Sequence, residues 1–158
     1  IIKSQFLYYP FYILSYSGYG EYKLSMALDE VKQKLNNDGI KFRQEHWNNK
    51  GCTPEVAWDI VKIDDTMSMF FAKNKMFKMY FETPSFWMLE NGISTKMTID
   101  EAKAIDRSIL YNDDEEDYES PNGYWLEESL DTGKIESITI FIKEILDDDE
   151  FYSYEWTK

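Results

Sequence analysis

The heptapeptide MALDEVK at residues 26–32 returns as MTIDEAK at residues 97–103, an offset of 71 residues. Four of the seven positions are identical, and two more exchange one apolar residue for another. Each copy follows a glycine-containing stretch, at residues 17–24 and 91–96. Apolar residues recur in both at the spacing of a helix face. We therefore predict two amphipathic helices, one from about Leu28 to Leu35 and one that begins at Ile99.

The two predicted helices differ at their ends. The second begins with a capping box, in which Thr98 and Glu101 satisfy N–H groups that the helix itself leaves unpaired. The first has Ala27 at the capping position, so we expect its cap to be weaker. It ends at the Asn-Asn-Asp-Gly turn signal of residues 36–39. The predicted apolar face of the second helix consists of Ile99, Ala102 and Ile105.

A second match lies downstream of each helix, where KMFKMYF at residues 75–81 pairs with KIESITI at residues 134–140. The offset here is 59 residues. Both segments alternate with period two, which is typical of strands. Both follow hairpin signals, Lys73-Asn74 and residues 131–133, whose Asn and Gly readily adopt positive φ. One further strand is predicted from the alternation of Val56, Trp58 and Ile60.

The recurring order of helix and hairpin predicts the fold class. We expect the 158 residues to form a single α+β domain, with a curved antiparallel sheet and two helices packed on one face. The sheet and helices would be built from two degenerate helix-plus-strands repeats, at about residues 16–82 and 87–144. The alternative is that two amphipathic helices with acidic first turns look alike by chance.

The glycine-led stretch, the helix start M-x-[L/I]-D-E-[V/A]-K and the strand K-[M/I]-x-x-[M/I] resemble the tandem repeats of β-lactamase-inhibitor-like proteins. The same unit occurs singly in small outer-membrane assembly lipoproteins. The resemblance spans residues 17–140, and the family's usual Leu-Gly pair before the helix Met is Leu24-Ser25 in one copy and Thr95-Lys96 in the other. It implies a curved sheet with helices on one face. In the inhibitors, the open concave face grips a protein target.

The charge of the chain is uneven. Seventeen Lys and Arg stand against 30 Asp and Glu, a net charge of −13. Residues 1–82 carry a net charge of +1, whereas residues 83–158 carry −14. This acidic balance argues against direct binding to nucleic acid or to an anionic membrane, because both favour basic surfaces.

Two acidic runs with interleaved aromatic residues carry most of the imbalance. They are either solvated loops or a surface for a basic partner, whose association such a field would speed. Tyr and Trp are frequent anchors of interfaces, which favours the second reading. The candidate partner-binding residues are Asp113, Asp114, Glu115, Glu116, Asp117, Tyr118, Glu119, Tyr124, Trp125, Asp147, Asp148, Asp149, Glu150 and Tyr152.

The sequence offers little for catalysis or metal binding. Cys52 is the one cysteine and His46 the one histidine, so an intramolecular disulfide and CxxC zinc sites are excluded. The run of residues 113–119 lacks the D-x-D-x-[D/N]-G spacing of a calcium loop. No phosphate-binding glycine motif or nucleophile elbow is present. We therefore expect no enzymatic activity, no cofactor and no dedicated metal site.

The leading hypothesis is a bacterial immunity protein, an antitoxin of the kind found in contact-dependent growth inhibition. It would neutralise a cognate basic toxin domain, with a nuclease as the expected class, because proteins that act on polyanions are generally basic. The alternative is a non-inhibitory protein-binding or assembly module. The apolar stretch of residues 6–14 is too short to span a bilayer, so we expect a cytoplasmic protein without membrane contact.

Overall fold

A computed structural model describes residues 11–53 and 55–147 of the chain. Within these residues, three short strands are followed twice by a helix and four strands, and a final 3-10 helix closes the series. The first elements are β1 (Ile13–Leu14), β2 (Gly18–Tyr19), β3 (Tyr22–Lys23), α2 (Leu28–Asn37), β4 (Arg43–Asn48), β5 (Ala57–Ile63), β6 (Met67–Ala72) and β7 (Lys75–Glu82). The second series comprises α3 (Ile99–Ile105), β8 (Leu110–Asn112), β9 (Asp117–Ser120), β10 (Tyr124–Glu128), β11 (Ile135–Phe141) and η1 (Lys143–Asp147).

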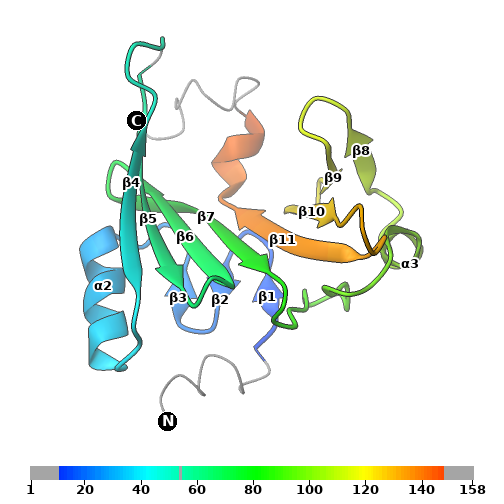
Figure 1. Cartoon of the computed structure of the whole chain (residues 1–158), viewed down its shortest axis with the longest axis horizontal. Helices are drawn as coiled ribbons and strands as arrows, with labels where there is room; N and C mark the ends of the chain where they lie inside the picture. The colour runs from blue at the N-terminus through cyan, green and yellow to red at the C-terminus, as the bar shows by residue number, and fades with distance from the viewer. Residues whose placement is uncertain (1–10, 54, 148–158) are drawn as a thin grey trace.

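Eight of the strands form one twisted sheet in the order β4-β5-β6-β7-β11-β10-β9-β8 (Figure 1). Every neighbouring pair in this sheet is antiparallel. Strands β7 and β11 meet at its centre, and β4 and β8 form its edges. The α+β class with antiparallel sheets and two helices is therefore confirmed. That the two halves are repeats, with both helices on one face, stays a prediction.

The hairpins lie where the turn signals predict them. Lys73 and Asn74 have φ angles of 48° and 62° between β6 and β7, and Gly133 has a φ of 67° between β10 and β11. The predicted strand around residues 56–60 corresponds to β5, which begins at Ala57. Val61 and Ile63 are its buried apolar residues, whereas Trp58 and Ile60 are only partly buried.

Both helices begin as predicted, and their caps differ in origin. In α3, the N–H of Glu101 donates to Thr98 Oγ1 at 3.2 Å, and the N–H of Thr98 donates to Glu101 Oε1 at 3.4 Å, which confirms the capping box. Ala27 provides no side-chain cap for α2. Instead, the N–H of Leu28 donates to the side chain of Asn74, 46 residues away.

The predicted apolar face of α3 is wrong at Ile105, whose side chain is 45% exposed. The helix has seven residues and its cap residue, Asp106, is already extended. Only Ile99 and Ala102 therefore lie deep enough to be buried. Neither α2 nor α3 is long and apolar enough to cross a membrane, and no other helix in the described residues is.

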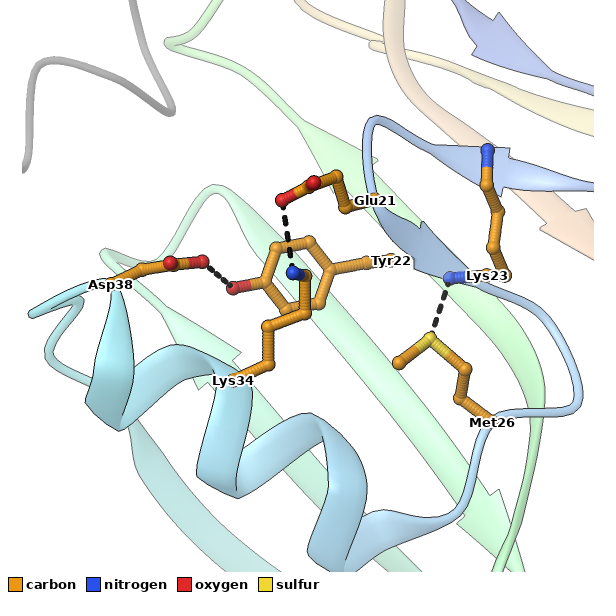
Figure 2. A network of polar contacts seen from close by, with 6 residues as sticks. All are labelled: Glu21, Tyr22, Lys23, Met26, Lys34 and Asp38. Atoms are coloured by element: carbon orange, nitrogen blue, oxygen red, sulfur yellow. Dashed lines mark hydrogen bonds and ion pairs between the residues drawn. The ribbon is translucent and has the colours of Figure 1, made fainter.

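Polar contacts fasten the small β1-β2-β3 sheet to α2 (Figure 2). The Tyr22 hydroxyl donates to Asp38 at 3.0 Å, just beyond the end of the helix. Lys34 in the last turn of α2 forms an ion pair with Glu21 at 2.9 Å. Burial, followed by the hydrogen bond to Asp38, raises the pKa of Tyr22 well above its usual value. These contacts fix the approach of the chain to the first helix.

One hydrophobic core draws on both helices, the small sheet and the large one. The central strands contribute alternate residues to it, and all of those are fully buried: Met69, Met79, Phe81, Ile138 and Ile140. Because side chains alternate along a strand, the residues between them face the opposite side of the sheet.

Two positions just before the helices share an unusual backbone conformation. Ser25 has a φ of 77° and Lys96 a φ of 71°. The N–H of Ser25 donates to the carbonyl of Met76 at 2.8 Å, and the N–H of Lys96 donates to that of Ile135 at 2.9 Å. This left-handed conformation costs a residue other than glycine about 1 kcal/mol.

Replacing Ser25 or Lys96 with glycine should raise the free energy of unfolding by about 0.5 kcal/mol. The relief of the left-handed conformation exceeds the backbone entropy that glycine loses on folding. Urea unfolding measures the change. Glu136→Gly, at an exposed position of β11, is the matched control and should destabilise the protein. If glycine at residue 25 or 96 lowered the free energy of unfolding as much as Glu136→Gly does, the result would contradict the positive φ angles.

Candidate partner-binding groove

The face of the large sheet opposite the core carries aromatic and charged side chains. Strand pairing sets four residues of this face in one row across β7, β11, β10 and β9: Tyr80, Thr139, Trp125 and Glu119. Phe70 and Lys78 form a cross-strand pair beside this row. The sheet therefore brings β9, which lies in the acidic half of the chain, close to β7 of the first half.

This face is hollowed by a groove with a volume of about 610 Å³, which we call the carboxylate groove. Its charged lining consists of Lys78, Glu115, Asp117, Glu119 and Glu127. Its aromatic lining consists of Trp58, Phe70, Tyr80 and Trp125. Asn112, Thr139 and the apolar residues Ile145 and Leu146 of η1 complete the described part of the wall.

Lys78 is a largely buried cation in this groove. Its Nζ lies 4.2 Å from the ring centroid of Phe70 and 5.3 Å from that of Trp58. It forms no ion pair with any residue in the described ranges. Burial lowers the pKa of Lys78 to about 8, and the negative charges of Glu127 and Glu115 oppose this shift. A buried charge without a direct counter-ion weakens the folded state.

The carboxyl group of Asp117 has one oxygen without a partner in the described part of the chain. Its Oδ1 is buried and accepts no hydrogen bond from the described part of the chain. Burial, followed by the charge of Glu119 and a hydrogen bond with it, raises the pKa of Asp117 to about 7, and Glu115 and Glu127 add to the effect. Near neutral pH this carboxyl group therefore carries a proton part of the time.

The other two strand carboxylates have donors. Glu119 accepts a hydrogen bond from Asn112 Nδ2 at 3.0 Å, and Glu127 accepts one from the Ser137 hydroxyl at 2.9 Å. Among the described residues, no three His, Cys, Asp or Glu side chains are arranged to hold a metal ion. As far as the described residues line it, the groove is thus a negatively charged hollow with one internal cation.

The loop between β8 and β9 is held in place by Asn112. Its Oδ1 accepts hydrogen bonds from the N–H groups of Asp114 at 2.9 Å and Glu115 at 3.2 Å. Asp113 and Asp114 line a second hollow of about 630 Å³, which shares Glu119 and Trp125 with the carboxylate groove. The acidic run predicted to bind a partner therefore borders two adjoining hollows.

The structure brings together part of the predicted site. Glu115, Asp117, Glu119 and Trp125 line the carboxylate groove, Asp113 and Asp114 the second hollow, and Glu116 is exposed in the turn. Asp147 is the last residue of η1. Four predicted residues lie outside the described ranges: Asp148, Asp149, Glu150 and Tyr152.

Two predicted aromatic anchors lie on the other side of the sheet. Tyr124 is 1% exposed in the core, and its hydroxyl donates to Asp106. Tyr118 is partly buried against the core, and its ring centroid lies 4.9 Å from that of Tyr111. The strand period explains this placement, because successive side chains point to opposite faces. The residues that follow the two tyrosines, Glu119 on β9 and Trp125 on β10, line the groove instead.

Asp106 is a structural acid that the sequence did not single out. Burial acts to raise its pKa, but four hydrogen bonds hold that pKa well below its usual range. The donors are Ser108, Tyr124, Ser120 and Asn122. This cluster ties the end of α3 to β9 and β10, and thereby supports the strands that carry the groove carboxylates.

Five residues that line the groove were not predicted from the sequence: Lys78, Tyr80, Glu127, Trp58 and Phe70. A signal exists in β7, where Lys78 and Tyr80 interrupt an apolar strand at alternate positions. The other groove residues near Lys78 and Tyr80 come from β9 and β10. Only the order of the strands in the sheet shows that they share a groove. His46 lies instead near the edge, 3.1 Å from Asp59, and Cys52 is exposed in the loop that follows β4.

Comparisons of the chain with protein-family models, with curated proteins and with solved structures found no match.

Replacing Lys78 with methionine should stabilise the protein by about 2 kcal/mol at pH 6, because the buried charge disappears. The folded pKa of Lys78, about 8, lies below its ordinary value of 10.5. The penalty is therefore fully present below pH 8 and is lost as the pH rises toward 10.5. Urea unfolding at pH 6 and at pH 10 measures how much Lys78→Met changes the free energy of unfolding at each pH. Exposed Lys143→Met is the control, and an equal gain in both variants would contradict this account.

Proposed function

We propose that the protein is an immunity protein that binds a basic toxin domain, a nuclease, with the carboxylate groove and the adjoining hollow. The observation that supports this function is the convergence of four carboxylates, one of which has an unpartnered oxygen, around a groove in which Lys78 is the one cation among the described residues. A nuclease must attract a polyanion and is therefore basic around its active site. An acidic groove complements such a surface in charge and blocks access to it.

The surface around the groove also fits a protein partner. Leu110 is 72% exposed and Tyr111 49% exposed on the edge strand β8, and both line the second hollow. Apolar residues beside a polar, charged groove are common at protein interfaces. The proposed function needs no contact with nucleic acid or membrane, and it implies a bacterial protein that acts in the cytoplasm.

We also propose that the fold consists of two degenerate repeats with both helices on one face. Ser25 and Lys96, which share a positive φ, are 71 residues apart, and the strand residues that they bind, Met76 and Ile135, are 59 apart. These are the two offsets of the sequence matches. The reciprocal bonds recur as well, from Met76 N–H to the Met26 carbonyl and from Ile135 N–H to the Met97 carbonyl. This regularity favours the resemblance to tandem-repeat inhibitors.

The test combines affinity capture with a toxicity assay. The wild type and a groove variant, E115Q/E119Q/E127Q, are used as baits in extracts of the source cells. The charge-matched control is D29N/E30Q/D131N, at exposed positions of α2 and of the turn between β10 and β11. A basic protein held by the wild type and the control, but not by the groove variant, is then expressed alone. We expect it to be toxic and to cleave nucleic acid, and the wild type to suppress both effects.

A partner without toxicity would favour the non-inhibitory binding or assembly module instead. A toxic partner held equally well by the groove variant would remove the carboxylate groove from the interface.

With the purified partner, the association rate constant should fall as the salt concentration rises, because exposed charges are screened over about 8 Å at physiological ionic strength. D113N/D114N should lower this rate constant more than it raises the dissociation rate constant. Trp125→Ala should act mainly on dissociation. Stopped-flow and surface-plasmon measurements give the constants. Leu130→Ala, at a 99% exposed position away from the groove, should change neither, and the same response from it would contradict the assignment.

A further inference from the structure

We infer that the carboxylate groove receives one arginine side chain of the partner, seated between the carboxyl groups of Asp117 and Glu119. This role deepens the proposed function and depends on it, since the arginine belongs to the basic partner. It identifies the chemical group that the groove recognises.

The unpaired oxygen of Asp117 is the first reason. Its Oδ1 is buried and has no donor among the described residues. A buried acceptor without a donor costs free energy that an incoming donor restores. A guanidinium group presents five N–H donors in one plane and can serve two carboxyl groups at once.

Lys78 is a second and independent reason. It lines the same groove, largely buried, and makes no ion pair within the described ranges. Its ammonium group lies over the ring of Phe70 at 4.2 Å. The aromatic end of the groove is therefore already occupied by a cation. One lysine cannot balance four carboxylates, so the end formed by Asp117 and Glu119 is where a second cation fits.

Arginine suits this place better than other ligands. Its guanidinium is flat and weakly hydrated, whereas the lysine ammonium is a compact and strongly hydrated charge. An anion could pair with Lys78, but Glu115, Glu119 and Glu127 line the same groove and would repel it. A buried guanidinium held by two carboxyl groups is also typical of the residues that dominate binding energy at interfaces.

Arginine binding should displace the proton of Asp117. The charged groups that face Asp117 are Glu115 and Glu119 on its own hairpin, Glu127 on β10 and Lys78 on β7. In the unbound protein burial, followed by the three acids, keeps its pKa at about 7. A cation within contact distance lowers a carboxyl pKa by about one to three units. Binding therefore releases a proton near neutral pH, and affinity rises as the pH increases from 6 to 8.

The experiment uses the full chain and two short peptides. Acetyl-Gly-Arg-Gly-amide is the probe, and the same peptide with citrulline, which is neutral and of equal shape, is the control. Carbon-13 NMR of the side-chain carboxyl groups follows the titration of Asp117. We expect the arginine peptide to lower the pKa of Asp117 by about one unit or more and the citrulline peptide to leave it unchanged. Titration curves that are identical with the two peptides would overturn the inference.

Two variants separate this contact from general electrostatic attraction. Asp117→Asn keeps the shape of the side chain and should weaken binding of the arginine peptide about tenfold, equivalent to about 1.4 kcal/mol. Asp131→Asn removes an equal charge from an exposed position that lines neither hollow, and it should weaken binding less than about twofold. Equal losses in the two variants would count against a seat at Asp117.

These experiments separate two failures, that of the arginine contact and that of the proposed function. If the captured toxin binds Asp117→Asn as tightly as wild type, with no change in affinity between pH 6 and pH 8, the arginine seat is wrong and the immunity function stands. If the arginine peptide shifts Asp117 but the captured partner is not toxic, the seat stands and the immunity function is wrong.

Discussion

The antiparallel pairing of β7 with β11 is the contact on which the rest of the molecule depends. It joins two four-stranded halves, each of which follows a helix, into one sheet. Its register sets Phe81 opposite Ile138 and Met79 opposite Ile140 on the core face. The same register sets Tyr80 opposite Thr139 on the other face. A slip of one residue would turn each of these side chains to the wrong side, so the core and the groove are fixed together.

The groove is built at a cost to stability. Lys78 is a buried cation with no direct counter-ion among the residues that the structure describes, and Asp117 is a partly buried acid surrounded by other acids. Neither arrangement helps the chain to fold, and a sheet of this size could be closed by apolar residues instead. Charged groups that cost stability in this way concentrate at functional sites. Their coincidence in one groove is the main physical reason to assign binding to this face.

Local signals were enough to predict much of the fold. The capping box of Thr98 and Glu101, the Lys73-Asn74 turn and the alternation of β7 and β11 depend on neighbouring residues and are all present. Long-range features could not be read in this way. The cap of α2 comes from Asn74, and the side of β10 that faces the core is set by pairing with β11. For that reason the acidic context of Tyr124 suggested an interface anchor, although its ring lies in the core.

The edges of the large sheet bear on how the protein behaves when it is abundant. Strand β4 carries Arg43 and Glu45, which form ion pairs with Asp65 and Lys62, and β8 is only three residues long. Charged or short edge strands resist pairing with strands of other molecules. Together with the net charge of −13, they disfavour the growth of the sheet into fibrils. A cell could therefore store this chain in large excess without its precipitating.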